Sequence, residues 1–322
     1  MFPLVSVIIP TFNRPKYFKE ALDSALNQTY RNVEIFVSDN STDDATERLI
    51  ATYDDARIKY FRHENFDAND NWNFARDYNN PAAEYVNWLM DDDLFYPPKI
   101  EKMIEIYRNH SDVSLVTSRR KGINADGKIT CEAATPFKDS CRVAGEAVGN
   151  FLFKTFNNFI GEPTTVLIRK KFLRDGDLCW HDDERGFFNL VDMSTWAQLL
   201  SKGNLFFINE PLSCCRVHSG IASHWVYTPP LSAIQWIKLI KSAWEQKIFL
   251  RTEKDIRQSI LAWFKYFVER GLELPLARGY HGKEVQTLEK YFVTMAQALS
   301  NGYKIELPPV EYSAQDKIKK IR

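Results

Sequence analysis

Residues 85–93 read YVNWLMDDD, a largely apolar run that ends in three consecutive aspartates. The run predicts a buried strand, and the acids fall where that strand would meet solvent. Adjacent carboxylates repel one another, and a divalent cation between them would offset the repulsion. Oxygen ligands of this kind suit Mg²⁺ or Mn²⁺, ions that commonly hold substrate phosphates. The stretch therefore indicates a metal–diphosphate site, and its alternative is a solvated acidic turn before a helix near Pro97.

The first third of the chain alternates between strand-like and helix-like patterns. Short apolar runs predict strands at residues 5–9, 33–37, 57–61 and 85–90. Helices are predicted from Pro15, over about residues 43–53, around 70–78 and after residue 100. Pro10 would end the first strand, and Ser41 with Asp44 would cap the second helix. The alternation predicts a doubly wound α/β unit, in which Asp39 and the acidic segment (residues 91–93) share the carboxyl edge of the sheet.

The rest of the chain divides into a mixed region and a helical one. Strands are predicted at residues 114–117, 164–168 and 205–208, with a turn at 124–127 and a helix that Gly203 ends. After about residue 231 apolar stripes recur at helical spacing. We therefore predict a nucleotide-sugar-binding half (1–110), an acceptor-side half of the same domain (111–225) and a helical C-terminal extension (226–322). The stripes would pack the helices together, or face a membrane surface or a second copy of the chain.

Composition narrows the classes of function. Among 322 residues, Lys+Arg and Asp+Glu both number 42, so the formal net charge is zero. This balance argues against a nucleic-acid partner, which requires a basic surface. The five cysteines show neither a CxxC pair nor metal-finger spacing, as expected for reduced thiols in the cytoplasm. We find no signal-peptide pattern and no spanning apolar stretch, so we expect a cytoplasmic protein, with peripheral contact at the inner face of the membrane as an option.

Four motifs occur in a recognisable order. Residues 5–14 read VSVIIPTFNR, and QTY at 28–30, SDNSTD at 38–43 and LMDDD at 89–93 follow. In order and spacing they resemble family 2 glycosyltransferases of the GT-A fold, inverting enzymes of bacterial polysaccharide and glycoconjugate assembly. The resemblance is strong over residues 3–110 and weaker over 160–222. It implies a GT-A-like doubly wound mixed sheet flanked by helices, with the helical extension beyond it.

The resemblance also implies a reaction. A hexosyl or deoxyhexosyl group would move from a nucleotide-diphosphate sugar, a UDP-sugar by preference, to a hydroxyl of a saccharide or glycolipid, with Mn²⁺ or Mg²⁺ as cofactor. Two alternatives stay open. A nucleotidyltransferase shares the scaffold and uses metal, but its phosphate loop is glycine-rich, and residues 10–14 contain no glycine. A sugar-nucleotide-binding subunit without turnover is the other.

By this resemblance the donor site draws on several segments. Its expected residues are Pro10, Thr11, Phe12, Asn13, Arg14, Asp39, Asn65, Asn71, Asp91 and Arg216. Asp39 would accept from the base or a ribose hydroxyl, and a simple Asx turn is the alternative. Asn71 lies in an Asn-Trp-Asn segment like that of relatives, although residues 66–67 replace their usual glycine, and helix capping is its alternative. Arg216 would pair with the diphosphate.

The metal and the catalytic base complete the expected site. By alignment on Pro97, Asp92 would be the direct metal ligand, with Asp93 and His218 beside it, although three acids in a row fit more than one register. Asp192 would deprotonate the acceptor hydroxyl, because it falls in the first turn of a helix whose dipole favours a carboxylate. A plain helix-start acid is the alternative. Rival bases are His181, Asp182, Asp183 and Glu184.

Overall fold

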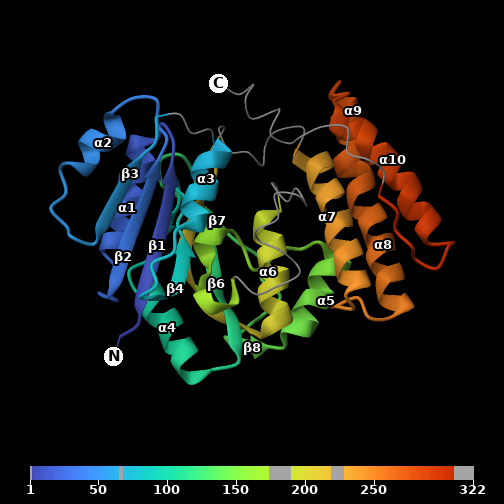
Figure 1. Cartoon of the computed structure of the whole chain (residues 1–322), viewed down its shortest axis with the longest axis horizontal. Coiled ribbons are helices and arrows are strands. Elements are labelled where there is room, and N and C mark those ends of the chain that lie inside the picture. The colour runs from blue at the N-terminus through green and yellow to red at the C-terminus, as the bar shows by residue number, and fades with distance from the viewer. Residues whose placement is uncertain (1, 65–67, 174–189, 219–227, 308–322) are drawn as a thin grey trace.

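The structure is a computed structural model that describes residues 2–64, 68–173, 190–218 and 228–307 (Figure 1). Within these residues a ten-stranded sheet runs in the order β3-β2-β1-β4-β9-β6-β10-β5, with β7 paired to β6 and β8 to β10. The strands are β1 (Leu4–Thr11), β2 (Val33–Asp39), β3 (Ile58–Arg62), β4 (Ala83–Trp88), β5 (Leu94–Phe95), β6 (Val113–Ile123), β7 (Ile129–Glu132), β8 (Cys141–Val143), β9 (Leu167–Arg169) and β10 (Asn204–Arg216).

Helices cover both faces of the sheet and form the far side of the molecule (Figure 1). They are α1 (Pro15–Leu26), α2 (Ala45–Ile50), α3 (Ala68–Asp77), α4 (Lys99–Asn109), α5 (Gly145–Thr155), α6 (Val191–Lys202), α7 (Thr228–Glu245), α8 (Glu253–Phe267), α9 (Leu274–Ala277) and α10 (Lys283–Ala298). Strands β3, β2, β1 and β4 pair in parallel, whereas β9 is antiparallel to both β4 and β6. The predicted doubly wound mixed sheet is confirmed.

The central strands are apolar on both sides because each face is covered. In β1, Ile8 packs into one hydrophobic core, and its neighbours Val7 and Ile9 pack into the other. This alternation follows from the period of two in a strand. The α1 side chains Phe18 and Leu22 close the second core. Both faces being buried fixes the register, so the carboxyl ends of β1 and β2 meet with Thr11 opposite Asp39.

The C-terminal helices α7, α8 and α10 stand side by side at the end of the molecule away from α1 and α2 (Figure 1). Helices α7 and α8 pack on α5, α10 packs on α7, and all share one core with the sheet. The Trp236 and Phe153 rings lie 5.6 Å apart edge to face. The Ser259 hydroxyl donates to the Phe153 carbonyl at 2.7 Å. The predicted helical extension is confirmed, and its boundary at residue 226 stays a proposal. None of the helices in the described ranges is both long and apolar enough to cross a membrane.

Three local predictions were wrong, each for an identifiable reason. Strand β1 does not end at Pro10 but continues to Thr11, because the fixed φ of proline suits an extended strand and only one ladder donor is lost. Ser41 does not cap α2, since its hydroxyl accepts the Asn13 N–H at 2.8 Å. The N–H of Ala45 is bonded instead by Asp43 at 3.0 Å.

The third wrong prediction concerns the strand at residues 164–168. A 3₁₀ turn, Pro163–Thr165, takes the place of its first half, and β9 begins only at Leu167. The Thr165 hydroxyl bonds the carbonyls of Ile160 and Glu162 at 2.9 and 2.7 Å. Such side-chain bonds to nearby backbone compete with a strand ladder. The turn matters for function because it brings Thr164 against the acidic segment.

Candidate active site

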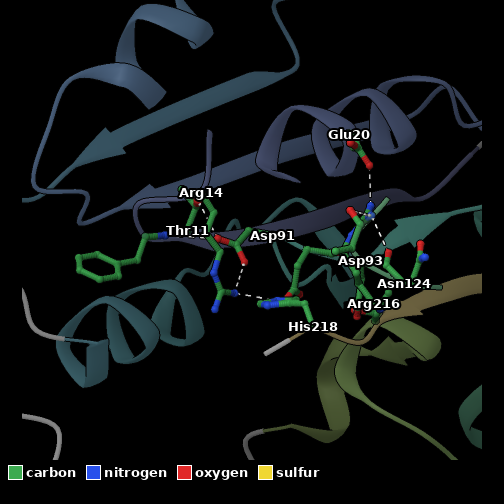
Figure 2. Close-up of polar contacts among 12 residues, drawn as sticks. Thr11, Arg14, Glu20, Asp91, Asp93, Asn124, Arg216 and His218 are labelled. Carbon is green, nitrogen blue, oxygen red and sulfur yellow. Dashed lines mark hydrogen bonds and ion pairs between the residues drawn. The ribbon is translucent and has the colours of Figure 1, made fainter. Parts of the chain in front are cut away.

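The loop after β1 and the acidic segment meet at the carboxyl edge of the sheet (Figure 2). Asp91 is buried, and its Oδ2 accepts from the Thr11 hydroxyl at 2.9 Å and the Phe12 N–H at 3.3 Å. Its Oδ1 lies 3.2 Å from the Arg14 guanidinium. Burial, reinforced by the neighbouring Asp92, raises the pKa of Asp91 to about 6, while Arg14 opposes the rise. Asp91 therefore ties the acidic segment to the loop after β1.

Asp92 receives two basic groups on the same oxygen. Its Oδ2 lies 3.1 Å from the Arg14 guanidinium and 3.0 Å from His218 Nε2. The Asp92 side chain is 12% exposed, so these contacts lie at the rim of the site. The structure thus brings Asp92 and His218 into contact across 126 positions of sequence, and their predicted role as metal ligands stays a prediction.

Asp93 points to different partners. Its Oδ1 accepts the Arg216 N–H at 2.9 Å, and its Oδ2 accepts the Thr164 hydroxyl at 2.6 Å. Burial, followed by the charge of Asp92, raises the pKa of Asp93 well above its usual range. Both oxygens therefore hold neighbouring segments in place, and the role of Asp93 as a metal ligand stays a prediction.

Arg216 is fully enclosed and turned toward α1. It bonds Glu20 at 2.5 Å and the Asn124 carbonyl at 3.2 Å, and its guanidinium carbon lies 4.6 Å from the centre of the Tyr17 ring. The Nε group also donates to the Asp92 carbonyl at 2.7 Å. Arg216 thus joins α1, the turn after β6 and the acidic segment. The predicted contact of Arg216 with a diphosphate stays a prediction. The sequence analysis did not identify Tyr17 and Glu20 as part of the site, although they follow Arg14 at helical spacing.

The donor set at this edge fits a divalent cation in part. Asp92 offers a carboxylate oxygen, which both Mn²⁺ and Mg²⁺ accept, and His218 offers an imidazole nitrogen, which suits a transition metal such as Mn²⁺ better than Mg²⁺. Among the described residues, no group of three or more His, Cys, Asp or Glu is placed to hold a metal together. Such a pair suits an ion that takes its remaining ligands from phosphate and water, as Mg²⁺ usually does.

Two predicted donor residues, Asn13 and Asn71, organise the loops. Asn13 adopts a positive φ of 52°, and its side-chain oxygen accepts the Thr42 N–H at 2.8 Å, so it fastens the loop after β1 to the loop after β2. Asn71 donates to the carbonyls of Thr11 and Ser38 at 3.2 and 3.1 Å, from within α3. Its amide therefore ties two strand ends together and caps no helix. Asn65 lies outside the described residues.

Asp39 forms the Asx turn that was its alternative interpretation. Its Oδ1 accepts the Ser41 N–H at 2.7 Å, and its Oδ2 accepts the Tyr60 hydroxyl at 2.7 Å. The residue has no exposed surface. A nucleoside would reach this carboxylate only by displacing the Tyr60 hydroxyl or the Ser41 backbone, so direct contact stays a prediction. Phe12, by contrast, is 44% exposed and presents a ring to solvent next to Asp91.

Asp192 lies in the first turn of α6, as predicted, and is partly buried. It accepts from the Asn158 amide at 3.1 Å and from the Met193 N–H at 2.7 Å. Burial raises the pKa of Asp192 to about 7; the Met193 N–H opposes this, and the charge of Glu162 adds to it. A carboxyl that titrates near neutrality suits a general base. The rival bases at residues 181–184 lie outside the described residues.

A segment to which the sequence assigned no chemistry connects the two acidic sites. We call residues 158–165 the bridging loop. At one end Asn158 bonds Asp192, and at the other Thr164 bonds Asp93. Gly161 has a φ of 101°, and an added Cβ would lie 2.6 Å from the Thr165 hydroxyl, so only glycine fits there. The Trp196 indole donates to the Gly161 carbonyl at 3.0 Å and fixes the loop on α6.

Buried donors below the bridging loop hold it rigid. The Thr117 hydroxyl of β6 donates to the Ile160 carbonyl at 2.6 Å. The fully buried amine of Lys99, on α4, donates to the Thr165 carbonyl at 3.2 Å, and burial holds the pKa of Lys99 well below its usual range. On the outer side Glu162 pairs with Arg120 at 2.7 Å. The loop therefore places Glu162 near both acidic sites.

The fold is that of the GT-A class. Among solved structures, the chain is similar to Staphylococcus aureus TarS 1–349, crystallised with UDP-GlcNAc, with a TM-score of 0.55 and 16% sequence identity. That similarity covers 96% of this chain and 95% of the other and supports the fold. The sequence model of glycosyl transferase family 2 matches residues 6–176. The chain belongs to that family, and the resemblance that its motifs suggested is confirmed.

Curated relatives match parts of the chain. An uncharacterized glycosyltransferase of Rickettsia typhi is 31% identical over 220 residues, covering 67% of this chain and 64% of the relative's length. The GalNAc(5)-diNAcBac-PP-undecaprenol beta-1,3-glucosyltransferase of Campylobacter jejuni is 39% identical over 93 residues, covering 28% of this chain and 30% of that enzyme. The chain thus spans less than two thirds of the length of these relatives.

Proposed function

We propose that this protein is an inverting, metal-dependent glycosyltransferase. It would move a hexosyl or deoxyhexosyl group from a nucleoside-diphosphate sugar to a hydroxyl of a saccharide or glycolipid during assembly of cell-surface glycans. The observation that carries the proposal is the bridging loop: it joins an acid that titrates near pH 7, Asp192, to the acidic segment that pairs with His218. Sugar transfer requires a base and a diphosphate-binding site at a fixed separation, and the bridging loop contacts the residues that we propose for both.

In the proposed reaction Asp192 accepts the proton of the acceptor hydroxyl as that oxygen attacks the anomeric carbon. The new carbon–oxygen bond forms on one face of the sugar while the bond to the diphosphate oxygen breaks on the other, so the configuration inverts. Asn158 and the Met193 N–H hold the carboxylate toward the acceptor. A Mn²⁺ or Mg²⁺ ion bound by Asp92 and His218 would offset the charge of the leaving diphosphate.

The donor and acceptor classes are proposed from similarity and chemistry together. The TarS structure was solved with UDP-GlcNAc, which supports a UDP-sugar as the donor here. The Campylobacter jejuni relative is named for an undecaprenol-linked glycan, which supports a glycolipid acceptor. Thr11, Phe12 and the loop residues Pro10, Asn13 and Arg14 would border the nucleotide. We propose a cytoplasmic protein whose helical extension (226–322) meets the membrane or a second copy.

A donor panel tests the proposal. The protein is incubated with individual nucleoside-diphosphate sugars and a saccharide or glycolipid acceptor, with Mn²⁺ or with a chelator, and release of the nucleotide is measured. We expect release with one class of donor, dependent on Mn²⁺ and on the acceptor. Pyrophosphate release from a nucleoside triphosphate would point to nucleotidyl transfer instead. Calorimetric binding of every donor without turnover would indicate a sugar-nucleotide-binding subunit.

A further inference from the structure

Arg14 lies where an external cation is expected. Its guanidinium is 3.2 Å from Asp91 Oδ1 and 3.1 Å from Asp92 Oδ2, the same oxygen that His218 contacts at 3.0 Å (Figure 2). From the sequence alone, a divalent ion was expected to offset the repulsion among the three adjacent aspartates. In the structure Arg14 supplies part of that positive charge from within the chain.

Arg14 and a divalent ion exclude each other at Asp92. An ion such as Mg²⁺ or Mn²⁺ sits about 2.1 Å from its oxygen ligands. A guanidinium hydrogen-bonded to the same oxygen would then lie within a few ångströms of a doubly charged ion, and like charges at that separation repel strongly at a partly buried site. Metal binding between Asp92 and His218 therefore requires the Arg14 side chain to move away.

The two arginines of the site differ in their ability to move. The Arg14 side chain is 34% exposed and extends from the short loop between β1 and α1. Arg216 is completely enclosed and bonds Glu20, two carbonyls of the turn after β6 and the Asp92 backbone. Displacing Arg216 would break several segments apart, whereas the Arg14 side chain lies partly exposed at the rim of the site.

We propose that Arg14 is a built-in counter-cation of the acidic segment, which a divalent ion must displace, and that the donor diphosphate takes up the displaced guanidinium. This inference rests on the proposed function. A guanidinium pairs well with diphosphate oxygens, so the donor offers Arg14 a new anion when the metal takes the old ones. Metal and nucleotide then favour each other's binding through Arg14, and that coupling must be reciprocal.

This inference is tested by titrating the protein with Mn²⁺ in the absence of nucleotide and measuring binding by calorimetry. Arg14→Met keeps the length of the side chain and removes its charge, and we expect it to bind Mn²⁺ roughly tenfold more tightly than wild type, the size of one charge-assisted hydrogen bond. Arg14→Lys keeps a cation and should stay within about threefold of wild type. Arg48→Met, at an exposed arginine paired with Asp44, is the matched control and should leave Mn²⁺ affinity unchanged.

Repeating the titration with saturating UDP tests the second half. UDP should tighten Mn²⁺ binding more in wild type than in Arg14→Met, because only wild type has a guanidinium to transfer. Equal or weaker Mn²⁺ binding by Arg14→Met without UDP overturns the inference. If that happens while wild type still binds Mn²⁺ and transfers sugar, the proposed function stands. If no variant binds Mn²⁺ with or without UDP, metal dependence falls as well.

Discussion

The acidic segment is buried and Asp192 is partly buried, and the groups around these acids differ in charge. Arg14, His218 and the Arg216 backbone surround the first. In the described part of the chain, the hydrogen-bond donors to Asp192 are neutral amides. The charged side chain that affects the pKa of Asp192 is another acid, Glu162. Burial raises the pKa of carboxyls in both places. This difference in charge fits our proposals that one site exchanges one cation for another and that the other takes up a proton.

Replacing the acid without cationic partners should have the largest effect. Asp192→Asn keeps the side-chain shape but cannot accept a proton, so we expect sugar transfer to fall about 10³-fold, in the range of general-base removal. Binding of Mn²⁺ and UDP should change little, because neither contacts this residue in our proposal. Steady-state transfer and calorimetry measure the two. Asp54→Asn, at an exposed acid before β3, is the control. Activity within tenfold of wild type would assign the base elsewhere.

Replacing an acid among the cations should cost less turnover and more metal affinity. Asp92→Asn removes the charge that His218 and Arg14 share, and we expect Mn²⁺ affinity to fall about 10–100-fold. Transfer at saturating Mn²⁺ should then recover in part, which Asp192→Asn cannot do. Transfer rates measured against Mn²⁺ concentration separate the two variants. The comparison fails if excess Mn²⁺ rescues both variants or neither.

The donor half of the fold was predictable because its signals are local. Short β-branched runs and the proline that opens α1 define strands and helices within a few residues, and the covered sheet then brings Asp39 and the acidic segment to one edge. The acid in the first turn of α6 was also a local signal. The predicted strand at 164–168 was wrong because the Thr165 hydroxyl bonds the nearby backbone, a competition that periodicity does not reveal.

The partners of the site were not predictable because they are distant in sequence. Glu20 and Arg216 are separated by 196 positions, and Thr164 reaches Asp93 across 71. A single sequence offers no pattern that links such residues. The sequence suggested an external ion to neutralise the aspartates because it could not show that Arg14 lies beside Asp92. That position depends on how the loop after β1 turns. The role of the bridging loop emerged only from its contacts at both ends.

The pH dependence of sugar transfer by the wild-type protein should follow the titration of Asp192. Because the pKa of Asp192 is raised to about 7, kcat/KM for the acceptor should fall roughly tenfold per pH unit below that value. The same raised pKa makes the folded protein lose stability as pH rises through about 7, since the ionised form is the one that burial disfavours. Asp192→Asn should lack this loss, so its Tm should exceed that of wild type at pH 8 more than at pH 5.

The smallest effect should come from the acid that lies between the two sites. Glu162→Gln removes the negative charge that helps raise the pKa of Asp192, so the acidic limb should move to lower pH and kcat/KM at pH 6 should rise roughly two- to fivefold. The effect stays small because the Glu162 side chain is 45% exposed and pairs with Arg120 at 2.7 Å. Added salt should move the wild-type limb the same way and leave Glu162→Gln unchanged. Glu132→Gln, a similarly exposed acid paired with Arg119, is the control. A limb that stays in place in Glu162→Gln would show that the charge of Glu162 does not contribute to the proton affinity of Asp192.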